Sequence, residues 1–257
     1  MNMFSEVGRE RVESYAIDLS FSMRDKLFFF DKVDTKTFVD YGCADGEMGR
    51  ALRRLDGSIR YFGYDMSPAM IARGRGIDPG IELYDRWDEL TSSLDDEPAT
   101  LILSSIIHEV YSYGNLASIS TFLRRTLRNA RWRRIVIRDM IPDAGVYRRS
   151  DLRDVEKIRA VAGSRLAEYE VRRGSIEMQA NLLGFLLRYR YESDWARELD
   201  EDYMPLTERQ LMMLIPEDLT VTYVSRRTPS FIKKRARLDF GIKNFDDVHL
   251  SVVLSRS

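Results

Sequence analysis

One segment near the start of the chain places strong limits on the fold. Residues 38–55, FVDYGCADGEMGRALRRL, begin as an apolar run, pass a glycine-containing bend and continue with Met48, Leu52 and Leu55 at helical spacing. A second apolar run follows and ends on the carboxylate of Asp65. This order predicts a buried strand, a tight turn, an amphipathic helix and a second, parallel strand.

The alternation of strand and helix continues along the chain. Apolar runs predict strands at residues 37–41, 60–64, 81–84, 101–107 and 134–141. Helices are expected at residues 47–55, from the Ser67-Pro68 cap onward and at residues 116–127. Two last strands, at residues 219–225 and 248–255, have no full helical pattern between them. We therefore predict an α/β fold with a doubly wound, mostly parallel seven-stranded sheet and an antiparallel C-terminal edge.

Four regions are expected. Residues 1–34 form an N-terminal helical segment, with one long or two short helices between residues 9 and 33. Residues 35–142 form the ligand-binding core, 143–206 a helical insertion, and 207–257 the C-terminal part of the core sheet. Thr207 is expected to cap a helix that runs to residue 214. Residues 226–244 are predicted to form a long basic loop.

Composition excludes several classes of protein. The 257 residues are 44% hydrophobic and 32% charged, as in ordinary globular proteins, and no apolar run is long enough to span a membrane. The polar start of the chain lacks the pattern of a secretory signal, and Cys43 has no second cysteine to pair with. The net charge of −1 gives no general attraction to nucleic acid. We expect a cytoplasmic protein without a metal site.

The bend and the acidic strand end suit a nucleoside ligand. Gly42 and Gly46 allow backbone to approach a ligand closely, and Asp65 suits two vicinal ribose hydroxyls. A pyrophosphate binder would show G-x-G-x-x-G, whereas this bend carries carboxylates at Asp40, Asp45 and Glu47. These repel a diphosphate but suit the cationic amino group of S-adenosylmethionine. The alternative is a strand–helix turn without a ligand.

Several motifs resemble those of the class I S-adenosylmethionine-dependent methyltransferases. They are D-x-G-C-x-x-G at Asp40–Gly46, G-Y-D-M-S-P-A-M-I at Gly63–Ile71, the fourth-strand run at residues 101–108, and the terminal strand pair. The resemblance covers residues 37–141 and 219–255. It implies a Rossmann-like methyltransferase fold and S-adenosyl-L-methionine as the cofactor.

The resemblance also implies a set of cofactor-binding residues. These are Asp40, Gly42, Ala44, Gly46, Asp65, Met66, Asp85, Trp87 and Ser104. Asp65 would bind the ribose and Met66 would lie against the adenine, while Asp85 or Trp87 would approach the adenine amino group. Trp87 is equally compatible with core packing. Ala44 stands where many relatives have glycine, and alanine fits there unless the position needs a positive φ.

The loop after the fourth strand carries the candidate acceptor-side residues. His108 is a plausible general base, Glu109 could orient it or take a proton, and Tyr111 follows close by. The alternative is that His108 forms a hydrogen bond with a backbone group and Glu109 caps a turn. No general base is then required, because methyl transfer often needs only alignment of the acceptor and exclusion of water. No Pro-Pro-aromatic element follows this strand, which argues against amino methylation of DNA bases. Carbon-5 methylation of pyrimidines needs a cysteine nucleophile, and the single cysteine, Cys43, lies in the cofactor bend instead.

The sequence leaves the identity of the acceptor open. The insertion is expected to act as a lid or substrate wall, and a small-molecule acceptor at an oxygen or nitrogen atom is favoured. A nucleic-acid substrate would use the basic residues Lys233, Lys234, Arg235 and Arg237. Two further hypotheses are an enzyme similar to carboxy-S-adenosylmethionine synthases, which residues 65–71 resemble, and a non-catalytic cofactor-binding scaffold. The sequence does not indicate an oligomeric state.

Overall fold

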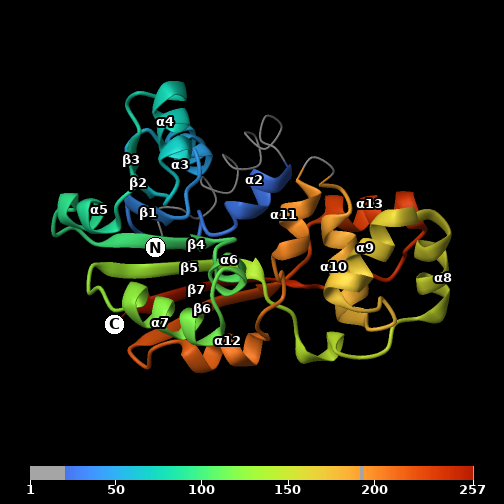
Figure 1. The fold of residues 1–257 in the computed structure, drawn as a ribbon. Helices are drawn as coiled ribbons and strands as arrows, with labels where there is room; N and C mark the ends of the chain where they lie inside the picture. The colour runs from blue at the N-terminus through green and yellow to red at the C-terminus, as the bar shows by residue number, and fades with distance from the viewer. Residues whose placement is uncertain (1–20, 192–193, 257) are drawn as a thin grey trace.

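A seven-stranded sheet forms the centre of the molecule (Figure 1). The computed structural model describes residues 21–191 and 194–256. The strands are β1 (Thr37–Tyr41), β2 (Arg60–Tyr64), β3 (Glu82–Tyr84), β4 (Ala99–Ser104), β5 (Trp132–Met140), β6 (Leu219–Arg226) and β7 (His249–Arg256). Their order is β3-β2-β1-β4-β5-β7-β6, and β7 runs antiparallel to both of its neighbours. This confirms the predicted doubly wound sheet with an antiparallel edge.

Helices cover both faces of the sheet. On one face lie α2 (Phe21–Lys26), α3 (Glu47–Leu55) and α4 (Pro68–Ile77), and on the other lie α5 (Trp87–Ser93), α6 (Ile107–Ser112), α7 (Leu116–Leu127) and α12 (Glu208–Leu214). The sequence encodes these helices locally: Ser67 caps α4, and capping boxes start α7 at Asn115 and α12 at Thr207. Apolar side chains from the two layers bury both faces of β1, β4 and β5.

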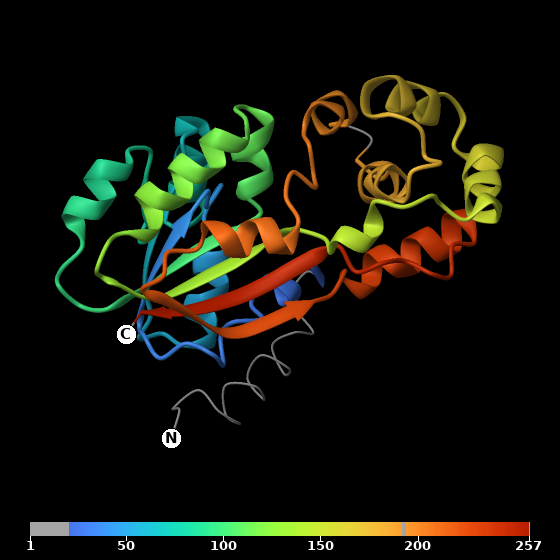
Figure 2. The same cartoon turned by 90° about the horizontal axis from the view of Figure 1, so that it is seen from below.

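A second group of helices gathers at one end of the sheet (Figures 1 and 2). It comprises a 3₁₀ turn (Ala144–Val146), α8 (Leu152–Val161), α9 (Gly163–Arg173), α10 (Gln179–Arg188), α11 (Trp195–Asp200) and α13 (Ser230–Phe240). We call these helices the helical lobe. Its own core includes Phe185, Leu186 and Phe240. A further cluster that includes Met140, Leu187 and Val248 joins the lobe to the end of the sheet.

The predicted basic loop at residues 226–244 is wrong, because α13 occupies its centre. Ile232, Ala236 and Phe240 recur every four residues and are buried, and Ala236 and Phe240 pack in the core of the lobe. The basic side chains that suggested a loop lie between them along the helix. The four-residue spacing of these apolar residues indicates a helix, but the basic residues between them made the segment resemble a loop.

The expected extent of the fourth strand was also wrong. β4 ends at Ser104 rather than near Ile107, because Ser105 adopts a φ of +61° and turns the chain. The Asp139 carboxylate accepts the backbone N–H groups of Ile107 and His108, at 2.7 and 3.2 Å, and so starts α6. At the N-terminus, α2 ends at Lys26, well before residue 33, and the part of the expected helix before residue 21 lies outside the described residues.

The packing of α3 on β2 gives a test of the fold. A Cβ at Gly49 would lie 2.3 Å from the Tyr61 ring, whereas nothing lies within 4 Å of one at Gly76 in α4. We expect Gly49→Ala to lower the free energy of unfolding by about 1–3 kcal/mol through overpacking. Gly76→Ala should raise it by about 0.5 kcal/mol through helix propensity. Urea unfolding of both variants measures the difference, and equal effects would contradict this packing.

Candidate active site

The bend between β1 and α3 requires glycine at two positions. Gly42 and Gly46 have φ angles of +80° and +78°. A Cβ at Gly42 would lie 2.9 Å from Ile106 Cδ1, and one at Gly46 would lie 2.8 Å from Ile81 Cδ1. The amides of Gly42 and Cys43 both donate to the Tyr64 carbonyl, which fixes the bend to the end of β2. A side chain is thus excluded at these two positions of the bend.

Asp65 is held in place at the carboxyl edge of the sheet. Its Oδ2 accepts the Ala44 N–H at 2.9 Å, and its Oδ1 accepts the Ser67 N–H at 2.9 Å. Each carboxylate oxygen keeps a second lone pair for a ligand. Met66 beside it is 82% exposed, and Asp85 is exposed immediately after β3. An oriented acid, an exposed apolar side chain and a second acid therefore share one edge of the sheet.

Ala44 occupies a strained position. Its φ is +49°, in the left-handed region, which is the one condition under which alanine does not fit easily at this site. The hydrogen bond from its N–H to Asp65 is the contact that this backbone conformation provides. Strain at this residue is thus coupled to the orientation of the Asp65 carboxylate.

The three carboxylates of the bend differ in their surroundings. Asp40 is buried, and burial raises its pKa to about 6 although the Tyr61 hydroxyl donates to it at 2.6 Å. Asp45 forms ion pairs with Arg50 at 3.0 Å and with Arg73 at 3.2 Å, so its charge is largely neutralised. Glu47 is exposed. The ion pairs of Asp45 thus reduce the negative charge that this bend offers to a ligand.

Two further expected cofactor residues lie in different settings. Trp87 packs in an aromatic cluster, with its ring centroid 4.8 Å from that of Tyr41 and 5.5 Å from that of Tyr64. This contact is core packing, which was one of its two interpretations. Ser104 ends β4, and its buried Oγ has no hydrogen-bond partner among the described residues. Such an orphaned hydroxyl suits a polar ligand group.

His108 lies between two carboxylates from opposite sides. Its Nδ1 is 2.7 Å from Asp139 Oδ1 in β5, and its Nε2 is 3.7 Å from Glu201 Oε2 at the end of α11. Burial works to lower the pKa of this imidazole, but Asp139 and Glu201 outweigh it and raise the pKa to about 10. His108 is therefore a buried cation at neutral pH that links the sheet to the helical lobe. An imidazolium has no lone pair with which to act as a general base.

Glu109 and Tyr111 face different spaces. Glu109 lines the same cavity as His108, and burial raises its pKa. Tyr111 instead lines a separate cavity with Tyr147 and Arg172. The structure thus brings His108 and Glu109 together and separates Tyr111 from them.

A cavity of about 280 Å³ lies between the sheet and the helical lobe. We call it the interlobe cavity. Its walls come from α2, the loop after β4, α6, β5, α10, α11, α13 and the start of β7, with their flanking loops. Sequence reasoning missed much of its lining: Lys26, Arg138, Glu198, Tyr203 and His249. These residues come from five separate segments, and only the fold brings them together.

His249 is the second histidine of this region and differs from His108. It is 7% exposed, and its buried Nδ1 has no hydrogen-bond partner among residues 21–191 and 194–256. Burial and the nearby Arg138 lower its pKa to about 3, so the ring is neutral at physiological pH. The neutral imidazole with a free nitrogen is therefore His249 and not His108.

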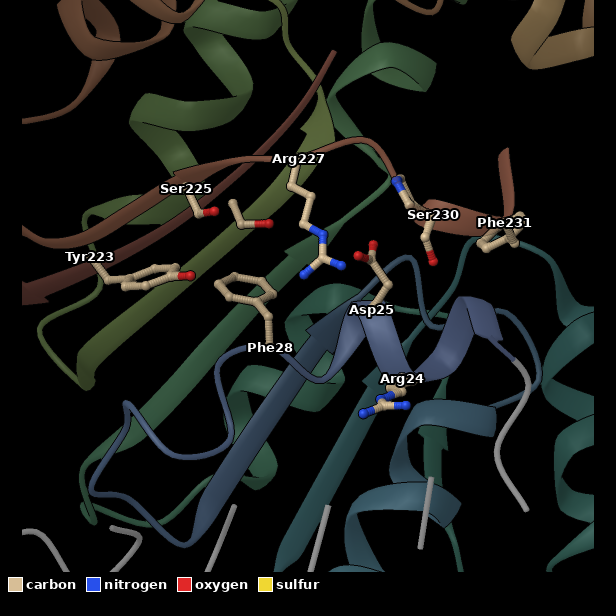
Figure 3. Close-up of a pocket in the computed structure, with 10 residues that line it drawn as sticks. Arg24, Asp25, Phe28, Tyr223, Ser225, Arg227, Ser230 and Phe231 are labelled. Carbon is tan, nitrogen blue, oxygen red and sulfur yellow. The ribbon is translucent and has the colours of Figure 1, made fainter. Parts of the chain in front are cut away.

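A second cavity, of about 370 Å³, lies where α2 meets the β6 and β7 edge. Figure 3 shows Arg227 pointing toward Asp25, and Phe28 lying beside Tyr223. The Asp25 carboxylate also forms an ion pair with Arg138, which lines the interlobe cavity. This pair ties α2 to β5.

The expected basic cluster lies on α13. Lys233 pairs with Asp247 at 2.7 Å and Arg235 pairs with Asp239 at 2.7 Å, while Lys234 and Arg237 are exposed. In the part of the chain that the structure describes, no helix is long and apolar enough to span a membrane. The same residues hold no group of three side chains suited to a metal ion.

Comparison with known proteins identifies the fold. No protein-family model matches the sequence, and no curated protein matches it. One similar solved structure is the plantazolicin methyltransferase BamL in complex with a triazolic desmethylPZN analog and SAH. It has a TM-score of 0.51 at 13% sequence identity, and the match covers 96% of this chain and 85% of the BamL chain. The chain has the class I methyltransferase fold.

Two further solved structures share this fold. The plantazolicin methyltransferase BpumL, with a monoazolic analog and SAH, gives a TM-score of 0.51 at 12% identity, over 98% of this chain and 89% of its own. The methyltransferase domain of a bacterial Hen1 protein gives a TM-score of 0.50 at 12% identity, over 93% of this chain and 100% of its own. In a methyltransferase fold, ligands bind outside the carboxyl ends of the parallel strands, where Asp65 and the interlobe cavity lie.

The buried charge of His108 predicts a pH dependence of stability. The pKa of His108 is about 6.5 in an unfolded chain and is raised to about 10 in the folded protein. The stabilisation of the folded state by the charged imidazole is therefore complete below pH 6.5 and is lost as the pH rises toward 10. The difference in unfolding free energy between the wild type and His108→Gln should shrink over that range. Urea unfolding at several pH values measures it.

His249→Gln provides the control for this experiment. Because the pKa of His249 is lowered to about 3, its effect on stability should stay constant above pH 6.5. A constant effect of His108→Gln from pH 6.5 to 10 would show that His108 is not held as a cation.

Proposed function

We propose that this protein is an S-adenosylmethionine-dependent methyltransferase that acts on a small molecule. The observation that carries the proposal is the Asp65 carboxylate, which two backbone amides orient at the edge of the sheet beside the exposed Met66. Vicinal ribose hydroxyls are suitable donors to such an acid, and Met66 offers an apolar surface to an adenine. The shared methyltransferase fold of BamL and BpumL, both crystallised with SAH, supports this choice.

The residues of the bend fit the rest of this cofactor. Gly42 and Gly46 permit the positive-φ bend beside which the methionine part would pass, and the orphaned Ser104 Oγ is available to its polar groups. When bound, S-adenosylmethionine would supply an electrophilic methyl group on its sulfonium. The protein's own contribution is to orient the acceptor and to exclude water.

The interlobe cavity is our proposed acceptor site. It is lined by Ser105 next to the cofactor-side Ser104, and the helical lobe covers it. The His108 ion pairs hold the lobe against the sheet, while neutral His249 offers a ring nitrogen that has no partner among the described residues. The walls come from eight segments, and two of the four basic α13 residues are already paired. Both features favour a small acceptor over nucleic acid.

Lys26 is our candidate for binding the cofactor's carboxylate. It lines the interlobe cavity, and among the described residues no carboxylate forms a direct ion pair with it. Burial and Arg138 lower its pKa, while Asp40 and Glu47 at the bend oppose this, so the amine lies within electrostatic reach of both. An amino-acid carboxylate placed between the bend and α2 would give this cation its missing partner.

Loss of Asp65 should remove cofactor binding. We expect Asp65→Ala to weaken the affinity for SAH at least 100-fold, because the ribose loses its acceptor and Ala44 loses its hydrogen bond. Asp65→Asn keeps the shape and should weaken binding less. Calorimetric titration with SAH, and with NAD as a comparison ligand, measures both. Unchanged SAH affinity in Asp65→Ala, or preferential binding of NAD to the wild type, would contradict the proposal.

The role of Lys26 can be separated from that of Asp65. Lys26→Met should weaken binding of SAH about tenfold but leave the affinity for methylthioadenosine unchanged, because that ligand lacks the amino-acid carboxylate. Arg24→Met, two residues earlier on an exposed side of α2, is the matched control and should change neither affinity. An equal loss for both ligands in Lys26→Met would indicate a structural effect instead.

A further inference from the structure

Arg190 lines the interlobe cavity, and no carboxylate of residues 21–191 and 194–256 forms an ion pair with it. It follows the end of α10, and its guanidinium lies 4.5 Å from the centre of the Tyr191 ring and 5.1 Å from that of Phe231. Its Nη2 donates to the Tyr191 hydroxyl, but its buried Nε makes no hydrogen bond among the described residues, and no described carboxylate lies within 4.0 Å. Aromatic faces and a neutral hydroxyl attract a guanidinium without neutralising its charge.

The other cations of the cavity are already satisfied. Arg138 pairs with Asp25, Arg197 pairs with Glu198 and Glu201, and His108 pairs with Asp139 and Glu201. Lys26 is the candidate for the cofactor's carboxylate. Among the cavity-lining cations that the structure describes, Arg190 is therefore the one that remains for an acceptor. Partly buried charges in proteins are normally paired, so an anionic ligand group would remove a desolvation cost at this position.

The neutral His249 supports the same conclusion. It lines the same cavity, its buried Nδ1 lacks a partner among the described residues, and Arg190 is near enough to act on it electrostatically. A carboxylate bonded to Arg190 leaves a second oxygen for a neighbouring donor, which an imidazole N–H in the appropriate tautomer supplies. The unsatisfied groups of two separate segments, the end of α10 and the start of β7, thus meet in one cavity.

The carboxylates of the cavity do not oppose an anion strongly. Glu198 and Glu201 are balanced by Arg197 and His108, and burial raises the pKa of Glu109. Glu198 Oε2 is buried without a partner among the described residues, so it can accept a hydrogen bond from a ligand hydroxyl or amine. The rings of Tyr203 and Phe231 supply apolar surface between these polar groups.

We propose that the acceptor is a small carboxylic acid with a planar apolar body, whose carboxylate pairs with Arg190 and whose body lies against Tyr203 and Phe231. The proposal rests on the assignment of the interlobe cavity as the acceptor site. Arg190 is then a specificity-determining residue, because an uncharged analogue of the acceptor would leave its guanidinium desolvated and unpaired.

Binding of two matched probes to the SAH-saturated protein tests this. Benzoate and benzamide have the same ring and nearly the same shape, and they differ in charge. NMR titration at pH 7.5 should show benzoate binding at least tenfold more tightly than benzamide. Arg190→Gln should abolish this preference while leaving SAH affinity unchanged. Arg227→Gln is the control, since Arg227 is exposed and lines the other cavity, and it should retain the preference.

Each outcome decides one question. Equal binding of the two probes, no binding of either, or a benzoate preference that survives Arg190→Gln would overturn the inference. If Arg190→Gln does not fold, the wild-type comparison together with Arg190→Lys, which should keep a benzoate preference, still tests it. Failure of the wild type to bind SAH at all would instead contradict the proposed function, and the SAH titration detects this separately.

Discussion

The carboxylate of Asp139 is the contact on which the acceptor side of the candidate site depends. It is buried in β5, accepts the backbone N–H groups of Ile107, His108 and Met140, and forms an ion pair with the His108 ring. These bonds start α6 and orient the imidazole with a single side chain. Burial alone would raise the pKa of Asp139, but the charge and hydrogen bonds of His108 and the Met140 amide hold it below its usual value. Asp139 keeps its negative charge although it is buried, because its carboxylate oxygens accept these hydrogen bonds and pair with the charged imidazole.

From this contact the helical lobe is fixed to the sheet. His108 reaches Glu201, and Arg188 donates to the backbone carbonyls of Glu198 and Glu201 from the buried end of α10. The lobe therefore meets the sheet through charged and hydrogen-bonded groups around the interlobe cavity, with apolar packing of Met140, Leu187 and Val248 beside it. The ion pairs and hydrogen bonds of this interface hold the helical lobe in a fixed position as one wall of the interlobe cavity, and they leave other polar atoms available to a ligand.

On the opposite side of the edge, the nucleoside half is built from backbone. The bend requires glycine at positions 42 and 46, and Asp65 is oriented by amides and not by other side chains. The two halves meet at Ser104 and Ser105, where β4 ends. A methyl donor on one side and an acceptor on the other would thus be aligned by the same turn that Asp139 stabilises.

Local patterns determined the cofactor half. The strands at residues 37–41 and 60–64, the helix at residues 47–55 and the caps at Ser67 and Thr207 follow from apolar spacing and capping chemistry within a few residues. Gly42, Gly46 and Asp65 could be placed at one edge of the sheet because a strand–turn–helix unit encodes its own turn. The same kind of local pattern was misread at α13, where the basic residues obscured the four-residue spacing of Ile232, Ala236 and Phe240.

The acceptor half was decided by tertiary structure. Nothing adjacent in sequence shows that His108 lies between Asp139 and Glu201, that His249 is neutral, or that Arg190 lacks a carboxylate partner among the described residues. The protonation and pairing of a side chain depend on burial and on charges brought from distant segments, and these quantities do not exist until the chain is folded. The sequence by itself determined the glycine bend and the acidic strand end at one edge of the sheet, and only the fold determined which groups line the interlobe cavity.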